Sequence, residues 1–187
     1  MAQTLVTEEK VLAEVAKAVA ETRGCDAAGI RPDNSLIKDL GAESLDFLDI
    51  NYRLEQAFGI KMARHFILEH IEEQFGEGTA IDQDGRITET AVRFLHARYG
   101  DGFQGFRANM DMDEVPSLLT VRTMAGAVLD ILDTLPGTCT RCGGAAWKSD
   151  GGVRVTCGSC GEPAVYANGD ELIRQWLAKT QLELKIC

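Results

Sequence analysis

The chain has 187 residues, 45% of them hydrophobic, and a formal net charge of −10, which predicts a packed core and argues against global disorder. The negative charge disfavours nucleic acid as the main partner and favours basic patches on partner proteins. The N-terminus lacks the basic and apolar regions of a secretory signal, and no apolar run reaches the ~20 residues of a membrane span. We therefore expect a cytoplasmic protein with no membrane span.

Charge is distributed unevenly along the chain. Residues 136–187 contain six basic and five acidic side chains, a balance of +1, so residues 1–135 carry −11. Pro136 and Gly137 at the junction predict a helix end and a short linker. We therefore predict two domains with the boundary between residues 135 and 136.

The first two predicted helices lie in the N-terminal domain. Residues 7–24 repeat apolar side chains at helical spacing, and Thr7 and Gly24 are typical of the two ends of a helix. A loop then leads to Ser44, which we place at the N-cap of a second helix that closes at Gly59. Its apolar positions predict one broad apolar face: Leu45, Leu48, Tyr52, Leu54 and Phe58.

A third helix of the same kind is predicted within residues 117–132, and the three together predict a helical bundle. Between the second and third helices lies an insertion, at about residues 63–115. It contains two more amphipathic patterns, residues 62–75 and 88–100, with Thr88 as the cap of the latter. The predicted fold class is therefore mainly α.

Two features of the insertion resemble metal-binding sites. "DQDGRI", residues 82–87, resembles part of a calcium loop, but Ala80 and Ala91 stand where carboxylate ligands are needed, so we predict a turn. The first two histidines are five residues apart, which places them on different faces of a helix. We expect all three histidines to be surface or packing residues: His65, His70 and His96.

The C-terminal domain contains two Cys-x-x-Cys pairs, "CTRCGG" and "CGSCGE". Four thiolates in this spacing favour one tetrahedral Zn²⁺ ion and predict a zinc ribbon with short strands near residues 145–149, 153–156 and 164–167. A disulfide pair is disfavoured in a reducing compartment, whereas a redox or iron role is the remaining alternative. A terminal helix follows, with Asp170 as its cap and Trp176 on its apolar side. The predicted ligands are Cys139, Cys142, Cys157 and Cys160, whereas Cys25 and Cys187 receive no role.

The stretch "DLGAESLDFLDINYRLEQAFGIKM", residues 39–62, resembles the acyl carrier protein family around its phosphopantetheine serine. "SLDFLDI" is most similar to the specialised carriers of long acyl chains, such as those destined for lipid A. The resemblance covers about residues 5–62 and 116–134. It implies a short four-helix bundle, and it implies that Ser44 receives 4′-phosphopantetheine from coenzyme A through a transferase.

The resemblance also implies a carrier rather than an enzyme. The thiol of the arm holds an acyl thioester for a specialised lipid or secondary-metabolite pathway. Enzymes that load or accept the acyl group then dock through basic patches on an acidic face, which speeds encounter. The implied docking residues are Glu43, Asp46, Asp49 and Glu55.

Other interpretations stay open at this point. The chain could be a scaffold that keeps the carrier fold without the arm, or a metal-dependent enzyme or nucleic-acid binder centred on the ribbon, although four cysteines close a zinc site. Residues 100–116 form a glycine-rich loop that is either pinned onto a core or lines an acyl pocket. Its apolar side chains are Phe103, Phe106, Met110 and Met112.

Overall fold

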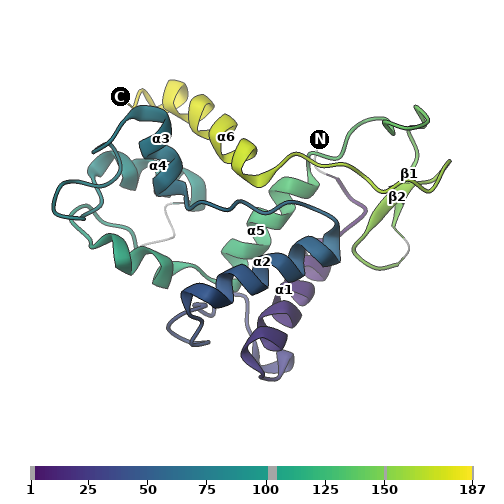
Figure 1. Ribbon diagram of the computed structural model, residues 1–187, viewed down its shortest axis with the longest axis horizontal. Coiled ribbons are helices and arrows are strands. Elements are labelled where there is room, and N and C mark those ends of the chain that lie inside the picture. Colours follow the sequence, from purple (N-terminus) through teal and green to yellow (C-terminus); the bar gives the residue numbers. More distant parts are fainter. Residues whose placement is uncertain (1–2, 101–104, 150, 187) are drawn as a thin grey trace. The chain divides into compact units, whose positions relative to one another are not determined.

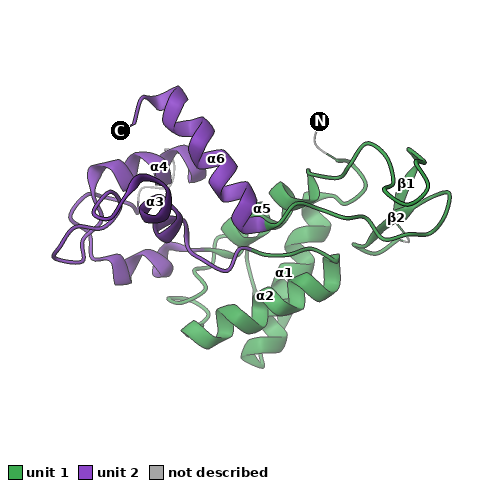
Figure 2. Cartoon of the chain, turned by 45° about the horizontal axis from the view of Figure 1, so that its top comes forward, with its two compact units in different colours: residues 1–62, 120–168 green, residues 63–119, 169–187 purple. Residues whose placement is uncertain are grey.

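The computed structural model describes residues 3–100, 105–149 and 151–186. The chain divides into two compact units, each built from two separate segments (Figure 2). Unit 1 contains Met1–Met62 and Thr120–Asn168, and unit 2 contains Ala63–Leu119 and Gly169–Cys187. The chain therefore passes from one unit to the other three times.

Unit 1 is built on three helices, α1 (Glu8–Arg23), α2 (Ser44–Phe58) and α5 (Val121–Leu132), and α1 packs against both of the others (Figure 1). A single 3₁₀ turn, η1 (Ala27–Gly29), lies in the loop between α1 and α2. The predicted bundle is confirmed. Its core side chains include Val11, Val15, Val19, Ile50, Leu54, Phe58, Val128 and Leu132.

The predicted ends of the first two helices are also confirmed. The hydroxyl of Thr7 accepts a hydrogen bond from the backbone N–H of Lys10 at 3.4 Å. Gly24 and Gly59 end their helices in the left-handed conformation, with φ of 65° and 72°. Glycine adopts this conformation without a steric clash because it has no Cβ atom.

The apolar side chains of α2 do not form the single face that the sequence predicted. Leu45, Leu48 and Tyr52 are 77%, 63% and 60% exposed. The buried face is formed instead by Phe47, Ile50, Leu54 and Phe58. Two apolar stripes therefore share this helix, and only one of them contributes to the core.

The four cysteines lie in a small ribbon within unit 1. Its strands β1 (Trp147–Ser149) and β2 (Val155–Cys157) pair antiparallel, whereas the predicted third strand is reduced to an isolated bridge between Thr156 and Pro163. Two hydrogen bonds connect the ribbon to the segment that follows α5. The indole of Trp147 donates to the carbonyl of Pro136 at 2.8 Å, and the N–H of Ala167 donates to the hydroxyl of Thr134 at 2.9 Å.

Unit 2 contains α3 (Ile67–Phe75), α4 (Glu89–Tyr99), the 3₁₀ helix η2 (Met112–Leu118) and the terminal helix α6 (Gly169–Leu184). These helices share one core, to which α6 contributes Leu177 and the segment after it contributes Ile186. Trp176 packs against that core, as predicted. The insertion and the terminal helix, which are far apart in sequence, thus form one folded unit.

The loops of unit 2 follow the sequence interpretation in most details. The hydroxyl of Thr88 accepts from the N–H of Ala91 at 3.1 Å and caps α4. The carboxylate of Asp82 accepts from the N–H groups of Asp84 and Arg86, both at 2.9 Å, and forms the predicted turn. In the glycine-rich loop, Phe106 and Met110 belong to the core and pin the loop onto it, whereas Met112 is exposed; Phe103 lies outside the described residues.

Across the described residues, no helix combines the length and the apolar character needed to cross a bilayer.

Candidate functional site

Ser44 is the first residue of α2, and Glu43 holds the N-cap position with φ of −107° and ψ of 170°. The predicted N-cap was therefore wrong by one residue: Glu43 is the N-cap, and Ser44 is the first residue of the helix. Its side chain is exposed, and its hydroxyl makes no hydrogen bond to another described residue. The first backbone N–H groups of a helix lack intrahelical partners and favour an anion. The hydroxyl of Ser44 thus stands, accessible and uncommitted, at a helix end that suits a phosphate group.

Asp46, rather than Ser44, supplies the side chain that caps α2. Its carboxylate accepts from the backbone N–H of Glu43 at 2.8 Å and from a guanidinium nitrogen of Arg23 at 2.7 Å. Arg23 also donates to the carbonyl of Leu40 at 3.2 Å. Arg23 therefore connects the end of α1 to both the loop and the first turn that flank Ser44, and these contacts hold the serine in place.

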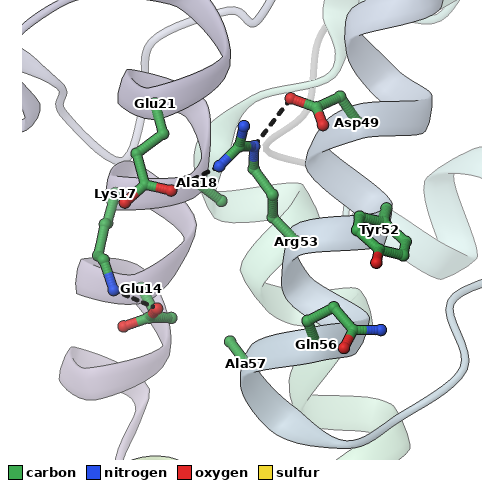
Figure 3. Close-up of a pocket in the computed structure, with 9 residues that line it drawn as sticks. All are labelled: Glu14, Lys17, Ala18, Glu21, Asp49, Tyr52, Arg53, Gln56 and Ala57. Carbon is green, nitrogen blue, oxygen red and sulfur yellow. Dashed lines mark hydrogen bonds and ion pairs between the residues drawn. The ribbon is translucent and has the colours of Figure 1, made fainter.

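Asp49 lies one turn further along α2, at the edge of a groove of about 420 Å³ between α1 and α2 (Figure 3). Arg53 reaches across this groove, donating to Asp49 at 2.8 Å and to Glu21 of α1 at 2.6 Å. The hydroxyl of Thr22 donates to Asp49 at 2.7 Å. The bonds from Arg53 first, and then from Thr22, lower the pKa of Asp49 below its usual value.

Glu55 belongs to a different environment from the other predicted docking residues. Its side chain is only 11% exposed. It accepts from the backbone N–H of Met62 at 3.0 Å and from Lys61 at 3.3 Å. These contacts fasten the segment after α2 back onto the helix. Glu43, by contrast, is exposed beside Ser44, so the four carboxylates differ in how readily another protein can reach them.

The exposed stripe of α2 begins next to Ser44 and is the part of the site that sequence reasoning missed. Leu45, Leu48 and Tyr52 are spaced as one side of a helix, and so are the core residues of α2. Helical periodicity cannot tell which of two such stripes faces the core. The one signal in the sequence that could have identified the buried stripe is that it contains more apolar residues than the exposed stripe.

The four cysteines of the ribbon come together as predicted. All four sulfur atoms lie within 4.8 Å of one another, with 3.7 Å between those of Cys139 and Cys160 and 3.6 Å between those of Cys142 and Cys157. A tetrahedral zinc ion with Zn–S bonds of about 2.3 Å separates its sulfur ligands by about 3.8 Å. The donor atoms and their spacing therefore fit zinc. The remaining cysteine within the described residues, Cys25, is exposed, and Cys187 lies outside them.

The backbone of the ribbon prepares these sulfurs for metal binding. Backbone N–H groups of Cys160 and Ser159 donate toward the sulfur of Cys157 and lower the pKa of that thiol to about 6. The N–H of Glu162 also lowers the pKa of Cys160, but the neighbouring sulfurs and burial outweigh it and raise that pKa to about 12. Without metal, the negative charge of one thiolate therefore disfavours ionisation of the neighbouring thiols. A divalent cation offsets this repulsion between the thiolates.

Comparison with known proteins assigns a family to the N-terminal part of the chain. The family model described as "Phosphopantetheine attachment site" matches residues 13–72, which include Ser44. Three curated relatives are each called "Acyl carrier protein AcpXL". The one from Rhizobium etli is 49% identical over 49 residues, which are 26% of this chain and 53% of the relative. The one from Brucella melitensis is 43% identical over 65 residues, or 35% and 66%.

The relative from Mesorhizobium japonicum is 39% identical over 71 residues, which are 38% of this chain and 72% of the relative. The chain thus spans between about half and three quarters of the length of these relatives. No solved structure matches the chain.

Proposed function

Because this chain belongs to the acyl carrier protein family, we propose that Ser44 carries 4′-phosphopantetheine. The thiol of that arm, when attached, holds an acyl group as a thioester. The observation that carries this proposal is the exposed Ser44 hydroxyl, which lies at the start of α2 inside the matched phosphopantetheine segment.

The residues around Ser44 suit the attachment. A phosphodiester on the Ser44 oxygen would lie beside the N–H groups of the first turn of α2, where negative charge is favoured. Arg23 lies 2.7 Å from the carboxylate of Asp46 and offsets its charge, which would otherwise oppose the phosphodiester. No described side chain bonds to the Ser44 hydroxyl, and we propose that the phosphopantetheinyl transferase supplies the base that accepts its proton.

We further propose that partner enzymes dock on the first half of α2. The exposed stripe of Leu45, Leu48 and Tyr52 supplies apolar area, and the acidic residues Glu43 and Asp46 border it. Basic patches on the transferase and on the acyl-loading and acyl-accepting enzymes would be steered to this charge, which raises the rate of encounter more than the affinity. Asp46, Asp49 and Glu55 all have intramolecular cationic partners, so we assign the largest electrostatic part in docking to Glu43, which is exposed beside Ser44.

The acyl chemistry is proposed from the relatives. We propose a cytoplasmic carrier of long acyl chains that serves a specialised lipid or secondary-metabolite pathway and performs no catalysis itself. The relatives, which are called acyl carrier proteins, support the carrier part of this proposal. The second candidate function is a scaffold that keeps the fold without the arm. It is favoured only by the additional folded parts, the ribbon and the greater part of unit 2, which lie beyond the matched segment.

We also propose that the ribbon holds one structural Zn²⁺ through Cys139, Cys142, Cys157 and Cys160. The spacing of their sulfur atoms supports this ligand set. Four protein ligands leave no position for a substrate, so such a site stabilises the fold rather than performing chemistry. A module with two three-residue strands has too small a core to fold without the metal.

The carrier function is tested by incubating the full chain with coenzyme A and a broad-specificity phosphopantetheinyl transferase, followed by intact-mass measurement. We expect the mass of one arm on the natural chain and no added mass on Ser44→Ala. An arm on the Ser44→Ala protein would show that the attachment site is a residue other than Ser44. A natural chain that stays unmodified both in this assay and when purified from its host would favour the scaffold.

A further inference from the structure

A second group of metal-ligating side chains lies in unit 2, outside the carrier site and the ribbon. One donor atom each from His65, His70 and Asp170 lie within 4.8 Å of one another. The side chain of His70 is fully buried, with an exposed fraction of 0%. Its Nε2 lies 3.0 Å from the carboxylate of Asp170, whereas its Nδ1 is buried without a hydrogen-bond partner. A carboxylate oxygen of Glu73 lies 3.6 Å from that Nδ1.

This arrangement places one imidazole between two carboxylates. A neutral imidazole carries a single N–H, so it can donate to only one side. With the proton on Nε2, the lone pair of Nδ1 faces Glu73; with the proton on Nδ1, the lone pair of Nε2 faces Asp170. Either tautomer sets two acceptors against each other, at 3.6 Å on the Glu73 side or at 3.0 Å on the Asp170 side. A positive charge on the Nδ1 side, either a second proton or a metal ion, removes the conflict.

Asp170 fixes which nitrogen remains available. Its Oδ1 accepts from the N–H groups of Arg64 at 2.9 Å and His65 at 3.3 Å, in addition to His70. Three donors on one carboxylate oxygen favour its ionised form. An ionised carboxylate draws the proton of His70 to Nε2 and leaves Nδ1 as the ligand nitrogen. A carboxylate that orients a histidine in this way is the usual support of a metal-bound imidazole.

A second imidazole lies beside the first. Because α3 begins only at Ile67, His65 precedes the helix, and the predicted separation of the two histidines onto different helix faces does not apply. Their rings lie edge to face, 5.7 Å apart. The Nδ1 of His65 lies 3.9 Å from the other carboxylate oxygen of Glu73. A proton on His70 needs no second imidazole beside it, whereas a metal ion uses one.

We infer that His65, His70 and Glu73 hold a divalent transition-metal ion, zinc foremost, with Asp170 orienting His70. Zinc bonds of about 2.0–2.1 Å place tetrahedral ligands about 3.4 Å apart. The Nδ1 atoms of His70 and His65 lie 3.6 and 3.9 Å from the two different oxygens of Glu73. Rotation of the half-exposed side chains of His65 and Glu73 would bring both nitrogens and one of these oxygens to a common point. Two imidazoles and a carboxylate suit zinc and its neighbours in the first transition row rather than calcium or magnesium.

The position of the site indicates what the metal would do. Unit 2 is made of two segments that start at Ala63 and Gly169, and the site joins the first residues of both. Asp170 already bonds to the backbone of Arg64 and His65 across more than 100 positions of sequence. A metal ion bound there clamps the start of α6 to the segment that leads into α3, so it stabilises unit 2 independently of the ribbon.

The test is a zinc titration of the full chain that already contains one equivalent of zinc in its ribbon, followed by calorimetry and total-metal analysis. We expect a second equivalent to bind. His65→Ala and Glu73→Gln, both at half-exposed positions where loss of the side chain leaves no buried cavity, should weaken this second site at least ~10-fold. Glu77→Gln is the matched control, because Glu77 is an exposed glutamate after the same helix and its loss removes the same charge.

Nitrogen NMR of the imidazoles distinguishes the two ways of resolving the conflict at His70. Zinc should shift the Nδ1 resonances of His65 and His70 and leave Nε2 of His70 protonated. The inference is overturned if the natural chain binds only one equivalent and both nitrogens of His70 carry protons at neutral pH. It is equally overturned if His65→Ala and Glu73→Gln bind the second zinc as tightly as Glu77→Gln does.

Discussion

Ser44 and Asp46 are two residues apart, yet the structure separates their roles, and a pair of substitutions tests that separation. Ser44→Ala removes an exposed hydroxyl that bonds to no described residue, from the first position of α2. Asp46→Ala removes the acceptor of the Glu43 N–H at 2.8 Å and of Arg23 at 2.7 Å. We therefore expect the first change to abolish modification and the second to destabilise the fold.

The magnitudes follow from these contacts. Loss of a helix-capping carboxylate costs about 1 kcal/mol, within a range of about 0.5–2. A partly exposed ion pair adds between about 0 and 1 kcal/mol. The carboxylate of Asp46 is 20% exposed and also fixes Arg23, so we expect Asp46→Ala to lower the free energy of unfolding by about 1–2 kcal/mol. For Ser44→Ala, an exposed site with no bond to lose, we expect a change within about 0.5 kcal/mol.

Urea denaturation followed by circular dichroism measures the free energies, and intact mass after incubation with coenzyme A and transferase measures the modification. Asp46→Ala should still accept the arm, although more slowly, because the first turn of α2, which presents Ser44, loses its cap. A loss of more than about 1.5 kcal/mol in Ser44→Ala would mean that the hydroxyl caps the helix after all. An unchanged stability of Asp46→Ala would refute the capping role assigned to Asp46.

Three further predictions follow from the same contacts. Cys142→Ser should abolish zinc binding by the ribbon and unfold its strands while the helical signal persists, as metal analysis and circular dichroism would show; a variant that retains zinc would contradict the ligand set. Asp49 has a lowered pKa in the folded state, so its stabilising contribution is complete above its unfolded pKa of about 3.9 and is lost as pH falls through the folded value. The stability difference between the natural chain and Asp49→Asn should therefore shrink below about pH 4 in urea titrations. Leu48→Glu should leave stability unchanged, since Leu48 is 63% exposed, and should slow modification of Ser44 several-fold; equal rates would remove Leu48 from the docking surface.

Local signals predicted the parts of this fold that local physics decides. The ends of α1 follow from the capping chemistry of Thr7 and the conformational freedom of Gly24. The cysteine cluster follows from two short spacings, each of which fixes two thiols within one turn of backbone. The caps of α1 and each Cys-x-x-Cys pair are local, whereas the meeting of the two pairs, whose sulfurs pair across 15 and 21 positions, was predicted from the four ligands that zinc needs.

The features that the sequence did not reveal depend on contacts between distant segments. Which stripe of α2 is buried depends on what packs against it, and periodicity carries no such information. Asp170 was predicted as the cap of the terminal helix, and this was wrong, because α6 begins at Gly169 and already contains Asp170. Its carboxylate accepts from the backbone of Arg64 and His65, about a hundred residues earlier. The same long-range pairing joins α6 to the rest of unit 2 and creates the histidine cluster. No sequence pattern near residue 170 predicts this pairing.

The pairing of α6 with the rest of unit 2 also determines which deletion can test the function of the ribbon. A truncation after Leu135 removes the ribbon, but it also removes α6, whose Leu177 is completely buried in the core of unit 2. Loss of a large buried side chain alone costs about 2–5 kcal/mol, and loss of the whole helix would cost more. A truncated chain would therefore lose unit 2 whatever the ribbon does, and its failure would say nothing about partner selection.

An internal excision avoids this problem, because the ends of the ribbon are close together. The N–H of Ala167 lies 2.9 Å from the hydroxyl of Thr134, so a Gly-Ser linker of about three residues can replace residues 137–166 and keep α6. The excised ribbon is otherwise tied to the helices by few contacts, such as the one at 3.3 Å between Lys10 and Gly151. We expect the excised chain to fold and to accept the arm on Ser44 as the natural chain does.

We expect the excised chain to fail selectively at a later step, in exchange of the acyl group with its dedicated enzyme. A second contact made by the ribbon is intramolecular once α2 has docked, so even a weak contact raises the overall affinity, and its loss should slow that exchange at least ~10-fold. Equal exchange rates for the two chains would refute a partner-selecting ribbon. Aggregation of the excised chain, or failure of its Ser44 to be modified, would show instead that the ribbon covers apolar surface of the helical bundle.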